Sequence, residues 1–343
     1  MGAKDGFIEV VRVNMSLLRR RMKTPQLKLE LFVKGTKSQT DLCLCYMADR
    51  VPKQLIRQIK DRLDRMELET ILSSGYVQPF LENRRRCFFD AVGATQRPDV
   101  LCAKLLEGRV GLLIDGTPFA LVIPKLFCEN FQTMDDYCFR PAYATLIRWI
   151  KYAAFLIATL LPALYLAIAL HHPELLNHTL LLILAEAEEN APISLTAEAI
   201  GVLLVYEIIR EAGLRLPKAV GGAVSIVAGL IIGDAAVSSG LISTPMLTVT
   251  AIAVIAGFVI PDLAQNITLL RLAFLLAGGF WGIFGISLLG SVVLFHLCSG
   301  EICGFPIMAP FSPFYPKGLR DTLTRVSFRK MQSGNFTVED YHE

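Results

Sequence analysis

The sequence predicts an α/β cytosolic N-terminal domain followed by an α-helical polytopic membrane domain, with about four spans plus a polar or in-plane helix. Of its 343 residues, 53% are hydrophobic and 19% charged, a balance too apolar for a water-soluble protein of this length. Residues 1–151 hold 25 Lys and Arg against 17 Asp and Glu, whereas the remainder holds 9 against 14. Apolar runs of membrane length occur only after residue 151. We therefore expect a cytosolic domain over 1–145, a membrane domain over 146–305 and a basic cytosolic tail over 306–343.

The N-terminal segment is basic and has no apolar core of the length found in secretory signals, so we expect the first half to stay in the cytosol. Compact or alternating apolar stretches predict strands over 27–33 and 40–47. Apolar residues at helical spacing then predict a helix over 53–66, and a short strand or turn follows near 72–77. These elements indicate a small α/β unit.

The next elements are bounded by Pro and Gly residues. Pro98 begins a predicted helix that runs through Leu106 and stops at Gly108. Strands over 110–114 and 119–123 flank Asp115-Gly116-Thr117-Pro118, which has the composition of a tight turn. A phosphate-accepting role for Asp115 is the alternative, but no second acid or nucleotide loop accompanies it.

Two further features of the first half have structural interpretations. Arg84-Arg85-Arg86 lacks the interleaved aromatics of a nucleic-acid surface, so we expect a solvated face or contact with anionic lipid headgroups, and no nucleic-acid partner. The eight cysteines show no metal-like spacing, and no metal or cofactor is expected. The six in the first half are interpreted as buried reduced thiols: Cys43, Cys45, Cys87, Cys102, Cys128 and Cys138.

The membrane half begins with 152–170, an uncharged run long enough to cross about 30 Å of hydrocarbon. Arg148 and Lys151 precede it and indicate a cytosolic N-terminal side. The acidic stretch that follows predicts an outward-facing loop. Further spans are expected over 219–237, 246–260 and 273–297, the last rich in glycine for close helix packing or a hinge. With a basic, cytosolic C-terminus, four spans leave 195–209 as the buried or in-plane helix.

Carboxylates in this half are the candidate ion-pathway residues, because one carboxylate per subunit becomes a charged ring in a symmetric oligomer. Asp234 lies in an apolar context, so a pore role, pairing with a basic residue and an interfacial position remain open. Intrahelical pairing is expected for Glu207 with Arg210 and for Glu211 with Arg215. Glu198 has no basic residue within four positions, which makes it the better pore-lining candidate. A pore-mouth or plain solvated role is open for Glu186, Glu188 and Glu189.

Several sequence blocks carry a resemblance between about residue 97 and residue 326. They are Arg97-Pro98-Asp99, Leu106-Glu107-Gly108-Arg109, Asp115-Gly116-Thr117-Pro118, Arg210-Glu211-Ala212-Gly213 with Leu216-Pro217, Gly233 to Val237, and Pro316-Lys317-Gly318-Leu319-Arg320-Asp321-Thr322. In this order they resemble the A subunit of the spore germinant receptors, with the stage V sporulation protein AF group as a close relative. The Arg-Glu-Ala-Gly block favours the nutrient-receptor branch.

The resemblance implies an A subunit that works with a transporter-like B subunit and a lipoprotein C subunit in the spore inner membrane. It further implies a multi-pass homo-oligomer that conducts ions at the start of germination. Two departures stand out: the chain is shorter at its N-terminus than a typical member, as if the first of two soluble subdomains were missing, and Asp234 replaces a residue that is usually neutral and polar.

Three classes of function require different sequence features: a receptor or channel subunit, a transporter and a membrane-anchored enzyme. A non-enzymatic receptor or channel subunit fits the ordered motifs and the broken apolar runs. A secondary transporter would also use intramembrane carboxylates, but it predicts an internal repeat that is not found between 152–218 and 219–297. A membrane-anchored enzyme is disfavoured, because residues 1–151 contain no His, no nucleotide loop and no nucleophile motif.

Overall fold

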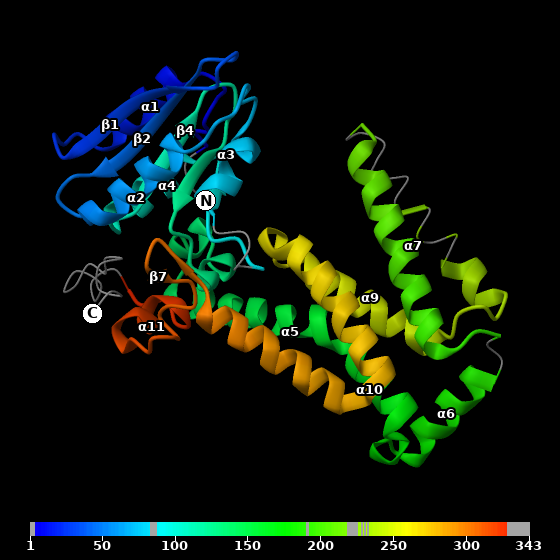
Figure 1. Cartoon of the computed structure of the whole chain (residues 1–343). Coiled ribbons are helices and arrows are strands. Elements are labelled where there is room, and N and C mark those ends of the chain that lie inside the picture. The colour runs from blue at the N-terminus through cyan, green and yellow to red at the C-terminus, as the bar shows by residue number, and fades with distance from the viewer. Residues whose placement is uncertain are drawn as a thin grey trace. The chain divides into compact units, whose positions relative to one another are not determined.

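The computed structural model describes residues 4–82, 88–189, 192–217 and 226–327, except 228, 230 and 232. The chain forms two compact units. The first consists of Met1–Trp149 and Leu294–Glu343, and the second is Ile150–Val293. The first unit is therefore built from two stretches of chain that are far apart in sequence (Figure 1).

The first unit contains a five-stranded antiparallel sheet in the order β1-β2-β4-β5-β3. Cys43 of the second strand in this order pairs with Leu113 of the third. Every residue of the fourth strand, Ala120–Ile123, is buried. The inner strands of the sheet are therefore covered on both faces, whereas the first strand is partly exposed. Its strands are β1 (Leu27–Lys34), β2 (Thr40–Met47), β3 (Gly93–Thr95), β4 (Val110–Ile114) and β5 (Ala120–Ile123).

Helices α1 (Val11–Arg21) and α4 (Pro98–Leu106) pack on one face of the sheet. Leu18, Cys43 and Leu113 belong to the core cluster there, and all are buried. Leu42 and Leu44 alternate with the buried cysteines of β2 and fill the opposite face. Helices α2 (Lys53–Asp64) and α3 (Ser74–Leu81) contact each other, and α3 contacts β5.

Most of the predicted elements of this unit are confirmed, with three corrections. The segment expected as a strand or turn near 72–77 is helix α3, because Val77 and Leu81 gain burial on one helical face. Helix α1 and strand β3 were not predicted. The expectation of buried thiols holds for Cys43, Cys45, Cys102 and Cys128 but is wrong for Cys138, which is exposed. Cys87 and the run Arg84-Arg85-Arg86 lie outside the described residues.

The C-terminal stretch packs back onto the chain that follows β5. This chain forms short 3-10 turns over Phe127–Phe131 and Met134–Tyr137. The backbone N–H of Phe127 donates to the carbonyl of Ile307 at 2.9 Å, and Leu126, Cys128 and Ala309 form a small buried cluster. The stretch also contains the hairpin β6 (Glu301–Ile302) and β7 (Phe305–Pro306), and helix α11 (Pro316–Thr322).

The second unit is helical, and two of the helices in the described part of the chain are long and apolar enough to cross a membrane: Pro141–His171 and Pro261–Ser299. The predicted spans 152–170 and 273–297 lie within them. The other elements are 3-10 turns over Pro173–Leu175 and Pro261–Leu263, and the helices α5 (Pro141–His171), α6 (His178–Glu189), α7 (Leu195–Arg215), α9 (Thr244–Phe258) and α10 (Ala264–Ser299).

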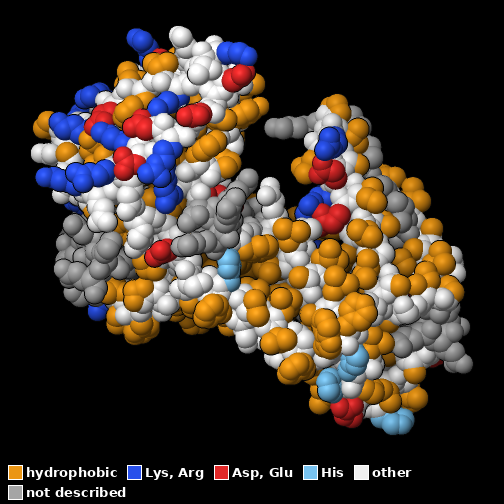
Figure 2. All heavy atoms as spheres, viewed as in Figure 1, with side chains coloured by type: hydrophobic (Ala, Val, Ile, Leu, Met, Phe, Trp, Pro, Cys, Tyr) orange, Lys and Arg blue, Asp and Glu red, His pale blue; other side chains and the backbone are white. Residues whose placement is uncertain are grey.

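Four spans are not found among the described residues. Helix α9 (Thr244–Phe258) overlaps the predicted span 246–260 but has 15 residues, which rise only about 22 Å. Most of the predicted span 219–237 lies outside the described residues. The expected outward loop after the first span is partly wrong, because its acidic part belongs to helix α6. Figure 2 shows hydrophobic side chains spread over the helical unit, whereas the charged side chains gather on the α/β unit.

Candidate functional site

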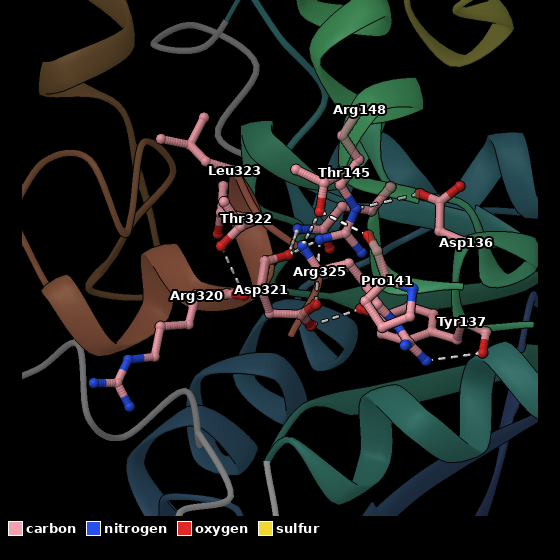
Figure 3. Close-up of polar contacts among 12 residues, drawn as sticks. Asp136, Tyr137, Pro141, Thr145, Arg148, Arg320, Asp321, Thr322, Leu323 and Arg325 are labelled. Carbon is pink, nitrogen blue, oxygen red and sulfur yellow. Dashed lines mark hydrogen bonds and ion pairs between the residues drawn. The ribbon is translucent and has the colours of Figure 1, made fainter. Parts of the chain in front are cut away.

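The most connected polar cluster lies in the first unit, where helix α5 begins and helix α11 ends (Figure 3). Its centre is the guanidinium of Arg148, which is fully buried. We call the cluster the Arg148 clasp, and it consists of Asp136, Tyr137, Arg148, Asp321 and Arg325.

Charge-assisted bonds converge on Arg148 from two segments. Its Nε lies 3.3 Å from Oδ2 of Asp136, and its Nη1 lies 3.2 Å from Oδ1 of Asp321. The same Nη1 also donates to the backbone carbonyl of Asp321. The Tyr137 hydroxyl donates to Oδ2 of Asp321 at 2.6 Å, while Arg325 Nη2 donates to the Tyr137 carbonyl at 3.0 Å. The start of α5 and the end of α11 are thereby tied together.

Burial changes the pKa values of two groups in the clasp. Burial raises the pKa of the Asp321 carboxyl, although the Tyr137 hydroxyl and the Arg148 charge act to lower it. Burial and the neighbouring Asp321 also raise the pKa of the Tyr137 hydroxyl. Tyr137 is therefore a neutral donor at physiological pH, and the clasp ties the two segments together.

A second buried charge cluster contains the block Leu106-Glu107-Gly108-Arg109. Arg109 is 2% exposed and pairs with Glu129 and, at 3.1 Å, with Glu107. Its Nη1 donates to the carbonyl of Pro124 at 2.8 Å. Burial alone would raise the pKa of Glu129, but the charges of Arg109 and Lys104 lower it. Gly108 ends helix α4 with φ +83°, a conformation that favours glycine.

Two further sequence blocks make contacts at the starts of helices. Oδ1 of Asp115 accepts the backbone N–H of Val11 at 2.9 Å and so satisfies the start of helix α1. Gly116 has φ +81°, as expected for this turn, and Pro118 follows in the same loop. At the start of α4, Arg97 makes a two-pronged contact with Asp99, with Nη2 to Oδ2 at 2.7 Å. These residues are structural in the single chain.

Glu198 is the candidate that the structure buries most completely, at 3% exposed. Its Oε1 accepts both the backbone N–H and the hydroxyl of Ser243, each at 2.7 Å. Ser243 is the N-cap residue of α9, so Glu198 places its charge at the positive end of that helix. Its Oε2 meets no hydrogen-bond donor among the described residues. In the single chain Glu198 therefore joins α7 to α9.

The other charges of α7 form the expected intrahelical pairs. Arg210 pairs with Glu207, and Thr268 links both of them by hydrogen bonds of 3.1 Å. Glu211 pairs with Arg215 at 2.7 Å on an exposed face. Gly213 lies in the last turns of α7, and Pro217 comes just after it.

Asp234 and Glu186 differ from Glu198 because both are exposed. Asp234 lies in the helical stretch 233–238, directly after Gly233, and no ion-pair partner for it is found in the described part of the chain. Glu188 and Glu189 lie at the end of α6, and their side chains are outside the described set.

Helix α10 is broken within its glycine-rich run. Gly282 has φ +60° and ψ −148°, outside the helical region, although its neighbours are helical. The ring of His171 would contact a side chain at this position, and its Nε2 lies 2.9 Å from the carbonyl oxygen of Gly279. The His171 ring therefore contacts the backbone of α10 within one turn of the break.

Two buried cations were not predicted in these roles. Arg148 is fully buried in the first unit, and its expected position beside the membrane stays a prediction. Arg271 is 4% exposed and donates from Nε to the carbonyl of Ala158 at 2.8 Å. The partner of Arg148 is distant in sequence, but the block Pro316–Thr322, which contains Asp321, was a signal that could have pointed to it.

Comparisons with known proteins give a consistent result. The profile described as "Bacillus/Clostridium GerA spore germination protein" matches residues 1–335. Spore germination protein KA of Bacillus subtilis (strain 168) is 39% identical over 328 residues, which are 95% of this chain and 60% of that protein. Spore germination protein GerLA of Bacillus cereus is 32% identical over 327 residues, 95% of this chain and 66% of that protein.

One solved structure is also similar in sequence. It is the crystal structure of the N-terminal domain of the A subunit of the Bacillus megaterium spore germinant receptor GerK3, which is 37% identical and has a TM-score of 0.30. The match covers 36% of this chain and 98% of that one. This chain spans about three fifths to two thirds of the length of the curated relatives named above. The chain belongs to the GerA family of spore germination proteins.

Proposed function

We propose that this chain is the A subunit of a nutrient germinant receptor in the spore inner membrane, and that copies of it assemble into an ion-conducting pore whose opening triggers germination. Membership of the GerA family supports the receptor role, because relatives along 95% of the chain are spore germination proteins. A transporter-like B subunit and a lipoprotein C subunit are the proposed partners.

The helical unit has a surface suited to lipid. Phe280, Trp281 and Phe284 of α10 are 66%, 68% and 71% exposed. Side chains of this size on a water-facing surface would form an apolar patch of the kind that marks a membrane or protein interface. Two helices of spanning length accompany them. We propose a multi-pass membrane location with both chain ends in the cytosol, and with residues 146–305 as the membrane domain.

The exposed carboxylate of Asp234 is the observation that carries the pore proposal. A carboxylate in an apolar helical stretch costs about 2.5–3.5 kcal/mol at the bilayer centre unless it faces water or a partner. Glu198 is already used to cap α9, whereas Asp234 has no ion-pair partner among the described residues. In a symmetric oligomer, Asp234 side chains around one axis would form a ring that attracts cations. Asp234 is therefore the preferred pore-lining residue.

The test compares two identical substitutions at exposed aspartates. Asp234→Asn removes the proposed ring, while Asp262→Asn changes an exposed carboxylate in the 3-10 turn Pro261–Leu263. The purified chain is reconstituted in lipid, its oligomeric state is measured, and single-channel currents are recorded in a potassium chloride gradient. We expect a closed oligomer whose cation selectivity falls in Asp234→Asn and is retained in Asp262→Asn. A monomer without current contradicts the pore, and unchanged selectivity in Asp234→Asn contradicts its lining.

The break at Gly282 supports a second candidate, a secondary transporter. Transporters often bind their substrates where membrane helices are interrupted. Gly282 interrupts an apolar helix beside the His171 ring. Current that flows without a transported solute favours the pore, whereas ion flux that strictly requires a cotransported solute favours the transporter.

A further inference from the structure

The first turns of helix α5 have the reverse of the polarity found in a water-soluble helix. Arg148 is fully buried, whereas Tyr143, Leu146 and Trp149 around it are 51%, 54% and 58% exposed. Phe139, just before the helix, is 44% exposed, and its ring packs edge to face on Tyr143 with centroids 5.4 Å apart. The helix thus turns its charge inward and its aromatic side chains outward.

The inward charge has a structural explanation, but the outward aromatics do not. Burial of an unpaired guanidinium is strongly unfavourable, and the Arg148 clasp offsets this cost through Asp136 and Asp321. The described residues of the first unit leave these three large apolar side chains more than half exposed. An arrangement with apolar side chains outside and a satisfied charge inside suits a surface that faces lipid.

The length of α5 gives the depth at which these side chains lie. The helix has 31 residues and rises about 46 Å, whereas the hydrocarbon core is about 30 Å thick. If the uncharged run from Tyr152 fills the hydrocarbon, the turns before it extend into the headgroup layer. The preceding turns carry Trp149, Leu146 and Tyr143, and Arg140 is exposed close by.

The chemistry of the side chains also fits that layer. The indole N–H of Trp149 donates to the carbonyl of Leu323 at 3.1 Å, while more than half of the side chain is exposed. Trp and Tyr are enriched where membrane meets water, because each has an apolar body and a polar atom. Arg140 is placed to attract lipid phosphates, a role that the buried Arg148 cannot fill.

We propose that Phe139, Tyr143, Leu146 and Trp149 form an apolar collar that lies in the lipid headgroup layer and sets the depth of α5 in the membrane. The collar continues the apolar surface of a helix that is long enough to span, which favours lipid over another protein as its occupant. The proposal rests on the membrane location given above as part of the proposed function.

The chain contains two tryptophans, Trp149 and Trp281, so two single substitutions separate the signals. Trp281→Phe leaves Trp149 as the only reporter of the collar, and Trp149→Phe leaves Trp281, which is 68% exposed in α10. Each variant of the full chain is reconstituted in phosphatidylcholine vesicles. The lipids are brominated either near the glycerol end or near the methyl end of the acyl chain, and iodide is added as the aqueous quencher.

We expect Trp149 fluorescence to be quenched about twofold more by bromine near the glycerol end than by bromine near the methyl end, as for a side chain at the interface. Quenching by iodide without quenching by brominated lipid would overturn the collar, because Trp149 would face water. Protection from both quenchers would also overturn it, because a second copy or another protein would cover the surface. If Trp281 is quenched by brominated lipid and Trp149 is not, only the collar fails. If neither is quenched by lipid, the proposed membrane location fails as well.

Discussion

Substitution of Arg148 by Met tests whether the clasp holds α5 and α11 together. The change removes a fully buried cation and leaves the Asp136 and Asp321 carboxylates without it. Removing one partner of a buried ion pair typically costs about 3–5 kcal/mol. The Asp321 side chain is 32% exposed, so water screens part of its charge, and we expect the lower end, about 3 kcal/mol. This corresponds to roughly a 150-fold loss of protection from local opening.

Amide hydrogen exchange of the full chain in lipid measures this opening directly. The amides of α11 and of residues 127–137 should exchange faster in Arg148→Met, since these segments are held by the clasp. Arg215→Met is the matched control, because Arg215 makes an exposed i,i+4 pair with Glu211 and should cost at most about 0.5 kcal/mol.

A second substitution makes the test stricter. Replacing Asp321 by Leu in the Arg148→Met background removes a carboxylate that has lost its partner. The double variant should therefore be less destabilised than the sum of the two single variants. If Arg148→Met is as mild as Arg215→Met, or if the two single effects simply add, the reasoning about the clasp is wrong.

Two other predictions concern packing and pH. A side chain at Gly278 would meet the Ala163 carbonyl oxygen at 2.7 Å, whereas one at Gly290 finds its nearest neighbour at 4.0 Å. Gly278→Leu should lower the free energy of unfolding by about 1–3 kcal/mol and so lower the thermal unfolding midpoint in lipid, whereas Gly290→Leu should leave the midpoint unchanged. Equal effects of the two substitutions would contradict close packing of α5 on α10. Because the pKa of Glu129 is lowered, its stabilising contribution is present above its usual value of 4.5 and is lost as the pH falls through the lowered value. Unfolding midpoints measured from pH 6 down to about 3 should therefore fall more steeply for the wild type than for Glu129→Gln, and parallel curves would refute this.

The sequence predicts elements of the α/β unit whose signals are local. Pro98 and Gly108 bound helix α4, and the Asp115-Gly116 turn separates β4 from β5. Helix α1 was not predicted because part of its stabilisation is tertiary. Its first N–H is satisfied by Asp115, which lies 104 positions away, and no local pattern reports such a cap. Helix α3 contains Pro79, a residue that usually argues against helix, and burial of its apolar face outweighs that local preference.

The candidate site was predictable only in part, for the same reason. Intrahelical pairs such as Glu207 with Arg210 follow from spacing within one helix. Arg148, however, looks like an ordinary membrane-flanking cation until the fold brings Asp321 to it. Spacing along the chain likewise does not reveal that Ser243, 45 positions from Glu198, binds one of its oxygens, and the pore role of Glu198 stays a prediction.

The order in which the clasp residues are synthesised has a consequence for biogenesis. Asp321 follows Arg148 by 173 positions, so a ribosome must translate all of Ile150–Val293 before the carboxylate exists. In a chain that threads this segment through the bilayer, Asp321 meets Arg148 only if the last helix exits on the side from which the first entered. A helix inserted in the wrong orientation would leave the two groups on opposite sides. The buried ion pair would thus form only in copies whose last helix has the correct orientation.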